Sequence, residues 1–254
     1  MSPGRRALFI RHDPDAHPGY VGDRVAERGF ENVDLAIATS MADPNPTVDF
    51  GDPGEYDLIV PLGSIWSVYD EETIGNWIGA ELAFLAEAHR RDIPILGVCF
   101  GGQALAAALG GTVSASPTPE VGWRMIESDR PDAIAEGPWM QWHYDRFTVP
   151  EGATELARNA IGPQAFILGR SLGLQFHPEV TEAIVHGWLD GAPAEYLAGP
   201  EIDPPGVRAD ATRFAPEARH RTNRIVDWFL DEICGGTLVP PLTTSDRSGT
   251  NSNV

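Results

Sequence analysis

IPILGVCFGGQ, residues 93–103, holds the strongest structural pattern in this sequence. An apolar run typical of a buried strand passes into a glycine-x-cysteine-x-glycine turn, and a helix-forming segment follows directly. Glycines are expected beside Cys99 because such a turn holds its central residue at strained backbone angles. The turn lifts the cysteine above the sheet and directs the helix N-terminus at it, which favours the reactive thiolate. An inert buried cysteine is the alternative reading, and the flanking glycines favour a nucleophile.

Strand-like and helix-like segments alternate around this turn. The runs typical of buried strands are residues 7–10, 33–37, 56–62 and 93–98, and those with helical character are 19–28, 74–91 and 102–109. This alternation predicts an α/β fold, with a mostly parallel sheet and helices on both of its faces.

The second half of the chain predicts extra short antiparallel strands, at the far side of the sheet or in a small lobe. These strand-like pieces are residues 121–127, 147–149, 166–168 and 172–176, and further helices are expected at 182–188 and 218–233. A segment rich in proline and glycine, 191–210, is interpreted as a surface connection. We expect one domain over residues 1–235 and a disordered tail over 236–254, because the tail is polar and lacks a periodic apolar pattern.

A nucleophilic cysteine needs a base, and His177 is the predicted one of seven histidines. It ends a short apolar strand in GLQFHPE, residues 173–179, and active sites of parallel α/β sheets lie at the carboxyl ends of the strands. Glu179, two residues on, can orient the imidazole as the third member of a triad. The order cysteine, histidine, glutamate disfavours an α/β-hydrolase, in which the acid precedes the histidine.

Composition excludes several other functions. The formal charge of −19 argues against nucleic acid as a partner, because phosphate binding needs concentrated positive charge. All eighteen basic residues are arginines, so neither a P-loop lysine nor a Schiff-base lysine is available. There is no apolar run long enough for a membrane span and no pattern of a signal peptide. Two cysteines make no disulfide framework, so we expect a cytoplasmic protein.

No cofactor or metal is predicted. The segment HDPDAH, residues 12–17, superficially resembles a metal-binding cluster, but it follows the first strand, where polar loop residues are expected. No CxxC spacing of the kind that binds zinc is present.

Taken together, these motifs resemble the class I, triad-type glutamine amidotransferases, and most of all their stand-alone GMP-synthetase-like branch. The resemblance covers roughly residues 6–234. It is carried by GSIWSVYD at 63–70, GVCFGGQ at 97–103, EVGW at 120–123, WHYD at 142–145 and GLQFHPE at 173–179. It implies a flavodoxin-like arrangement and a catalytic triad of Cys99, His177 and Glu179.

The resemblance also implies a role for other residues. An oxyanion hole is expected from the backbone N–H of Phe100 and from one in the loop at Gly63 and Ser64. Gln103 is a candidate contact to the glutamyl part of the substrate. His143 and Asp145 are expected at the edge of the cleft, in either a substrate-binding or a structural role.

One departure from the family pattern concerns this loop. The family usually has Gly-Gly-Pro where this chain has Gly63, Ser64 and Ile65, and Trp66 then adds a bulky wall beside the pocket. A backbone donor survives a change from glycine to serine only if the angles suit a residue with a Cβ. We interpret the change as altered substrate preference.

Two functions are therefore predicted. In the first, the chain hydrolyses the γ-amide of glutamine through a γ-glutamyl thioester and supplies ammonia to a separate synthase protein, since no ATP-binding motif is found in these residues. In the second, it is an independent hydrolase of γ-glutamyl amides or peptides. A non-enzymatic binding module and a cysteine esterase are the remaining alternatives.

Overall fold

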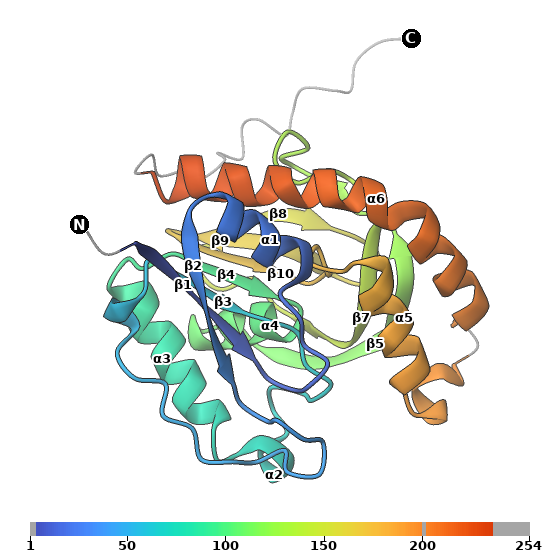
Figure 1. The fold of residues 1–254 in the computed structure, drawn as a ribbon, viewed down its shortest axis with the longest axis horizontal. Coiled ribbons are helices and arrows are strands. Elements are labelled where there is room, and N and C mark those ends of the chain that lie inside the picture. Colours follow the sequence, from blue (N-terminus) through green and yellow to red (C-terminus); the bar gives the residue numbers. More distant parts are fainter. Residues whose placement is uncertain (1–3, 200–201, 236–254) are drawn as a thin grey trace.

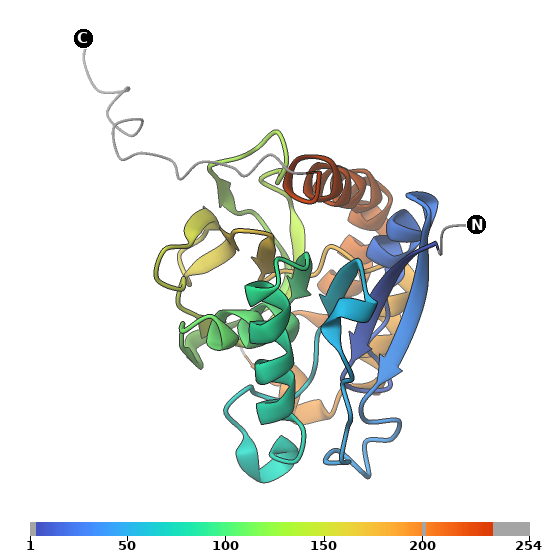
Figure 2. The same ribbon diagram turned by 90° about the vertical axis from the view of Figure 1, so that its left-hand side faces the viewer.

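The central feature of the computed structural model, which describes residues 4–199 and 202–235, is an eight-stranded sheet. Its order is β2-β1-β3-β4-β10-β9-β8-β6, and the first five strands of this order run parallel. Those strands are β1 (Arg5–Arg11), β2 (Phe30–Ala36), β3 (Leu58–Pro61), β4 (Ile95–Val98) and β10 (Ser171–Leu174). Figure 2 separates β1 and β2 (blue) at one edge of the sheet from β8 and β9 (yellow) toward the other.

Antiparallel strands complete the architecture. Three of them extend the sheet beyond β10: β9 (Pro163–Leu168), β8 (Thr154–Arg158) and β6 (Glu127–Ser128). A separate two-stranded sheet is formed by β5 (Val113–Arg124) and β7 (Trp139–Phe147). The predicted fold class, a mostly parallel α/β sheet with added antiparallel strands, is confirmed.

Helices cover both faces of the sheet. On one face lie α1 (Gly19–Glu27) and α6 (Pro204–Trp228), and on the other lie α3 (Ile78–Arg90) and α4 (Phe100–Ala108). Figure 1 shows α6 (red) running across the sheet and α5 (Glu182–Gly191) beside β5 and β7. The remaining short elements are α2 (Glu71–Ile74), the 3₁₀ turns Pro53–Glu55 and Ala194–Leu197, and the π-helical turn Phe229–Ile233. None of the helices in the described residues has the length and apolar character that crossing a membrane requires.

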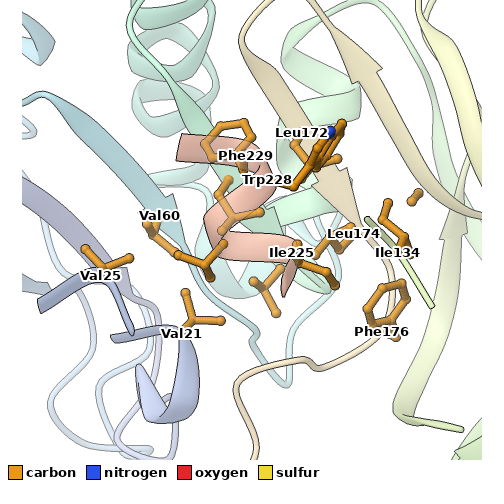
Figure 3. Packing of buried hydrophobic residues seen from close by; sticks show 14 of the residues in the cluster. Val21, Val25, Val60, Ile134, Leu172, Leu174, Phe176, Ile225, Trp228 and Phe229 are labelled. Carbon is orange, nitrogen blue, oxygen red and sulfur yellow. The ribbon is translucent and has the colours of Figure 1, made fainter. Parts of the chain in front are cut away.

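The two faces are buried by alternate residues of the same strands, as the twofold periodicity of a strand requires. In β1, Ala7 and Phe9 join the core under α1 and α6, whereas Leu8 and Ile10 join the core under α3 and α4. Figure 3 shows the first of these cores, in which Val21 of α1 and Ile225 of α6 belong to one apolar cluster with side chains of the sheet. Because β1, β3, β4 and β10 are buried on both faces, they appear in the sequence as continuous apolar runs, whereas the edge strand β2 alternates with exposed polar residues.

Several expected element boundaries are wrong. The helix expected over 74–91 begins later, at Ile78 of α3, because α2 ends at Ile74 and the backbone N–H of Asn76 donates to Asn45 Oδ1. The connection expected over 191–210 ends early, because Pro204 begins α6, and proline is tolerated in a first helical turn. The tail expected over 236–254 lies outside the described residues, and the domain over 1–235 remains a prediction.

Glycines in β4 and α4 allow close backbone packing around the turn that holds Cys99. A Cβ on Gly101 would lie 2.0 Å from the carbonyl oxygen of Pro61 in β3, and one on Gly97 would lie 2.6 Å from the oxygen of Gly101. Both obstacles are backbone atoms, which cannot rotate away. These two glycines are therefore required by packing around the turn at Cys99, which itself has φ 51°.

The substitution Gly101→Ala is expected to destabilise the protein by about 3 kcal/mol or more, because β3 and α4 must move apart. Urea unfolding followed by circular dichroism measures this loss. Gly187→Ala is the matched control, since Gly187 lies in α5 with no atom within 4 Å of the added Cβ. The control should stabilise the helix by about 0.5–1 kcal/mol. Equal stability of the two variants would contradict the packing argument.

Candidate active site

Cys99 lies in the sharp turn between β4 and α4. Its backbone has φ 51° and ψ −109°, a region that a non-glycine residue occupies only when surrounding contacts hold it there. The Cys99 N–H donates to the carbonyl oxygen of Leu174 in β10 at 2.8 Å, and its own carbonyl accepts from Gln103 N at 2.9 Å. The Sγ atom lies 3.8 Å from the carbonyl oxygen of Trp142. The thiol is thus buried, and these contacts fix it at the carboxyl edge of the sheet.

His177 is delivered to the same edge by the chain that leaves β10. Its backbone N–H donates to the carbonyl oxygen of Met140 at 2.9 Å, which ties it to β7. The ring is 4% exposed, packs edge-on against Trp188, and places Nδ1 2.7 Å from Glu179 Oε1. Among the described residues, Nε2 has no hydrogen-bond partner. One ring nitrogen is therefore held by a carboxylate while the other is available.

The electrostatics favour a protonated His177. Burial alone would lower its pKa, but the carboxylate of Glu179 and the nearby sulfur of Cys99 raise the pKa well above the ordinary 6.5. An imidazolium beside a cysteine stabilises the thiolate, so the arrangement is suited to nucleophilic chemistry.

The loop after β3 lies beside both Cys99 and His177. A Cβ on Gly63 would lie 3.0 Å from Cε1 of His177 and 3.9 Å from Cβ of Cys99, so only glycine fits without displacing the ring. The carbonyl oxygen of Leu62 accepts from Gly101 N at 2.9 Å, which joins this loop to α4. The backbone at Gly63 is therefore in contact with both Cys99 and His177.

A cavity of about 410 Å³ opens over these groups. The predicted site residues that line it are Gly63, Ser64, Trp66, Cys99, Gln103, His143, Asp145, His177 and Glu179. Phe100 is the exception, because its side chain is 1% exposed and packs in the core under α3 and α4. Its expected contribution is the backbone N–H at the first residue of α4, which bonds to no acceptor among the described residues.

Gln103 and Asp145 stabilise the cavity wall. The Gln103 side-chain amide donates to the carbonyl oxygen of Asp145 and to Gln175 Oε1, both at 3.3 Å. The Asp145 carboxylate accepts hydrogen bonds from Ser67 at 2.5 Å and Tyr69 at 2.7 Å. These bonds connect the loop at 63–70 with β7.

His143 is buried beside the same wall. Its Nδ1 lies 2.9 Å from the carbonyl oxygen of Asp145, and its Nε2 lies 3.2 Å from Glu120 Oε2. The segment 142–145, expected at the edge of the cleft, is the middle of β7. Nδ1 of His143 is thus bonded to a backbone acceptor, whereas Nε2 lies within ion-pair distance of Glu120 without a hydrogen bond.

Sequence reasoning missed several residues of the site. His12 was expected in a polar loop, but it is fully buried, with Nε2 2.9 Å from Glu81 Oε1 and Nδ1 3.2 Å from the carbonyl oxygen of Gly63. No group of three or more metal-binding side chains occurs in the part of the chain that the structure describes. Trp188 and Gln175 were also missed, and no local pattern distinguishes them from core residues.

Comparison with known proteins decides the family. The model of the family "Glutamine amidotransferase class-I" matches residues 32–184, more than half of the 254 residues. The chain belongs to the class I glutamine amidotransferases. The predicted resemblance and the predicted enzyme class, a hydrolase of the glutamine amide bond, are thereby confirmed.

Curated relatives of this amidotransferase include two enzymes named "GMP synthase [glutamine-hydrolyzing]". That of Rhizobium johnstonii is 29% identical over 167 residues, which are 61% of this chain and 26% of the relative. That of Aeropyrum pernix is 38% identical over 122 residues, which are 42% of this chain and 24% of the relative. The chain thus spans about a quarter of the length of these relatives.

Solved structures agree on the fold. A glutamine amidotransferase from Thermotoga maritima is 27% identical, with a TM-score of 0.75 over 89% of this chain and 98% of that one. A glutamine amidotransferase from Methylobacillus flagellatus, 22% identical, has a TM-score of 0.76 over 94% of this chain and 98% of that one, and it supports the fold alone.

The substitution Glu179→Gln is expected to lower the pKa of His177, because the carboxylate raises that pKa against the effect of burial. The ring of the variant should lose its proton at a lower pH than the ring of the unaltered protein. NMR titration of the His177 ring protons in both proteins measures the difference. Asp15→Asn removes an exposed carboxylate from the rim of the same cavity and is the control. An unchanged His177 titration in Glu179→Gln would refute the assignment.

Proposed function

We propose that Cys99, His177 and Glu179 hydrolyse the γ-amide of a glutamyl substrate through a thioester. The observation that carries the proposal is the unpartnered Nε2 of His177 in a cavity that also holds Cys99, with Nδ1 fixed by Glu179. A base oriented by a carboxylate on one nitrogen and directed at a nucleophile with the other has the geometry of a catalytic triad.

The first half of the reaction forms the thioester. The Cys99 thiolate attacks the γ-carbonyl carbon, and the carbonyl oxygen becomes an oxyanion. Two backbone N–H groups, those of Phe100 and Ser64, are proposed to bind this oxyanion. The His177 imidazolium then gives its Nε2 proton to the nitrogen as the C–N bond breaks, so that ammonia or an amine leaves and the γ-glutamyl group stays on sulfur.

The second half releases the acid. Neutral His177 takes a proton from water as the water oxygen attacks the thioester carbon. The tetrahedral intermediate collapses with cleavage of the C–S bond, which regenerates the thiolate and leaves His177 as the imidazolium. Throughout, Glu179 holds Nδ1–H and stabilises the charged ring.

Binding of the substrate's α-carboxylate needs donors other than basic side chains. No arginine is found among the described residues that line the cavity, and the sequence has no lysine. Backbone groups of β7 are the proposed donors. The carbonyls of Met140 and Trp142 point to His177 and Cys99 respectively, and alternate residues of a strand present both backbone groups on the same side. The N–H groups of Trp142 and Tyr144 therefore face the cavity.

The cavity also favours the second predicted function, hydrolysis of γ-glutamyl amides that carry an apolar amine. Aromatic side chains from four segments of the chain line it: Trp66, Trp142, Tyr144, Trp188 and Tyr196. A volume of about 410 Å³ falls in the range of pockets that hold ligands of drug size. An apolar substituent on the amide nitrogen would bury its surface against these rings.

Transfer of ammonia to a separate synthase remains the leading proposal for the product. It rests on the curated relatives named GMP synthase, in which this chain matches about a quarter of the length. The other three quarters of those proteins lie outside the region matched by this chain. We therefore assign the acceptor chemistry to another polypeptide or domain.

The substitution Cys99→Ala is expected to reduce release of ammonia from glutamine by roughly 10⁴-fold or more, because a triad without its nucleophile retains little activity. An enzyme-coupled ammonia assay measures this, and mass spectrometry should find a glutamine-mimicking diazo-ketone attached to Cys99. Cys234→Ala is the matched control, since burial raises the pKa of that thiol to about 12 and keeps it unreactive. Full turnover by Cys99→Ala would disprove the mechanism.

The aromatic wall is tested by Trp66→Ala, with the ratio of kcat/KM for γ-glutamyl anilide to kcat/KM for glutamine as the readout. If the ring binds an apolar amine, the ratio should fall by about tenfold or more, the effect of losing a sizeable apolar contact. Met125→Ala removes an exposed apolar side chain that does not line the cavity and serves as the control. A ratio unchanged by Trp66→Ala would favour glutamine itself as the substrate.

A further inference from the structure

A second buried histidine–carboxylate pair lies behind the loop at Gly63. His12 directly follows β1, and Glu81 belongs to α3, so the pair joins residues 69 positions apart in the sequence. Both side chains are 0% exposed. The imidazole is packed between aromatic rings, with centroids 5.7 Å from Trp77 and 4.6 Å from Phe100. Neither His12 nor Glu81 lines the cavity, and the proposed reaction uses neither of them.

Both ring nitrogens of His12 face acceptors. Nε2 lies 2.9 Å from a carboxylate oxygen of Glu81, and Nδ1 lies 3.2 Å from the carbonyl oxygen of Gly63, which can only accept. Burial lowers the pKa of His12, but the charge and hydrogen bond of Glu81 outweigh it, so the pKa is raised. Because a backbone carbonyl and a carboxylate face the two nitrogens, the geometry suits an imidazolium that donates from both of them.

Asp13 holds the other side of the same loop. Its Oδ2 accepts from the backbone N–H of Ile65 at 3.2 Å, and its Oδ1 accepts from Asp15 N at 2.9 Å. Asp13 is 3% exposed and, unlike His12 and Glu81, it lines the cavity. His12 and Asp13 therefore bind the backbone immediately before and immediately after Ser64.

The geometry of the peptide bond links these contacts to the cavity. The carbonyl of Gly63 and the N–H of Ser64 belong to one planar trans peptide, so they point in opposite directions. With the carbonyl directed at buried His12, the N–H points away from His12, and Ser64 lines the cavity. No acceptor in the described residues takes this N–H.

We infer that His12, charged by its contact with Glu81, and Asp13 are positioning residues that fix the Gly63–Ser64 peptide so that the Ser64 N–H binds the oxyanion. The inference rests on the proposed thioester mechanism. A glycine peptide rotates at little cost, because Gly63 has no Cβ to limit its backbone angles. An oxyanion donor is effective only if its peptide does not rotate and its orientation is set before charge develops on the substrate.

The test compares the double variant His12→Leu/Glu81→Leu, which removes both buried charges together, and the single variant Asp13→Ala. Turnover of glutamine or γ-glutamyl anilide, whichever the unaltered protein hydrolyses, gives kcat and KM. Inhibition by glutamate γ-semialdehyde reports on the oxyanion site, since its adduct with Cys99 carries an oxygen there. Alkylation by iodoacetamide needs only the thiolate. His89→Gln, which removes a histidine of α3 that contacts Ser171, is the control.

We expect kcat to fall by about 10²–10³-fold in the double variant, the range for loss of one oxyanion donor, with a smaller fall in Asp13→Ala. The inhibition constant of the aldehyde should rise in parallel, while KM, the alkylation rate and the control remain within about threefold. Circular dichroism and Tm establish that each variant is folded. If the double variant does not fold, Asp13→Ala carries the test by the same readouts.

Two outcomes overturn the inference alone. In one, the unaltered protein hydrolyses its substrate and binds the aldehyde, and the folded variants match it. In the other, the rate of alkylation by iodoacetamide falls together with kcat in the variants, which would mean that these residues act on the reactivity of Cys99 itself. An unaltered protein that neither turns over glutamine or γ-glutamyl anilide nor forms the aldehyde adduct overturns the proposed function, and the inference with it.

Discussion

The positive φ of Cys99 is held by backbone hydrogen bonds to two neighbouring segments. Its N–H donates to the carbonyl oxygen of Leu174 at the end of β10, and Gly101 N donates to that of Leu62, directly after β3. A residue with a Cβ does not remain at φ 51° by its own preference, so these contacts supply the energy that keeps it there. The same contacts fix the distances among the thiol, the loop at Gly63 and the segment that carries His177. The backbone contacts that pack these segments together therefore also set the geometry of the site.

The sequence predicted this part of the molecule because its signals are local. A strand, a glycine-flanked cysteine and a helix follow one another within residues 93–103, and His177 comes directly after an apolar run. Parallel strands buried on both faces make continuous apolar runs, so the core of the sheet was also predictable. The family pattern placed Gly63 and Ser64 beside the nucleophile.

What the sequence did not reveal depends on contacts between distant segments. The burial of His12 is invisible locally, because Glu81 and Gly63 reach it from α3 and from the loop after β3. The start of α6 was missed because Pro204 and its neighbours are typical of a loop, although proline suits a first helical turn. Helical periodicity also continued across residues 75–77, where a hydrogen bond to Asn45 breaks the helix.

The described residues contain three buried histidine–carboxylate pairs, and their second nitrogens separate their roles. In His12 and His143 the nitrogen away from the carboxylate meets a backbone carbonyl, that of Gly63 or of Asp145. In His177 it meets no described partner and opens on the cavity of Cys99. A buried histidine with both nitrogens occupied holds backbone in place, and one with a nitrogen left over can move a proton. The same chemical pair is thus proposed to support the loop in one place and the reaction in another, and the difference is a single hydrogen bond.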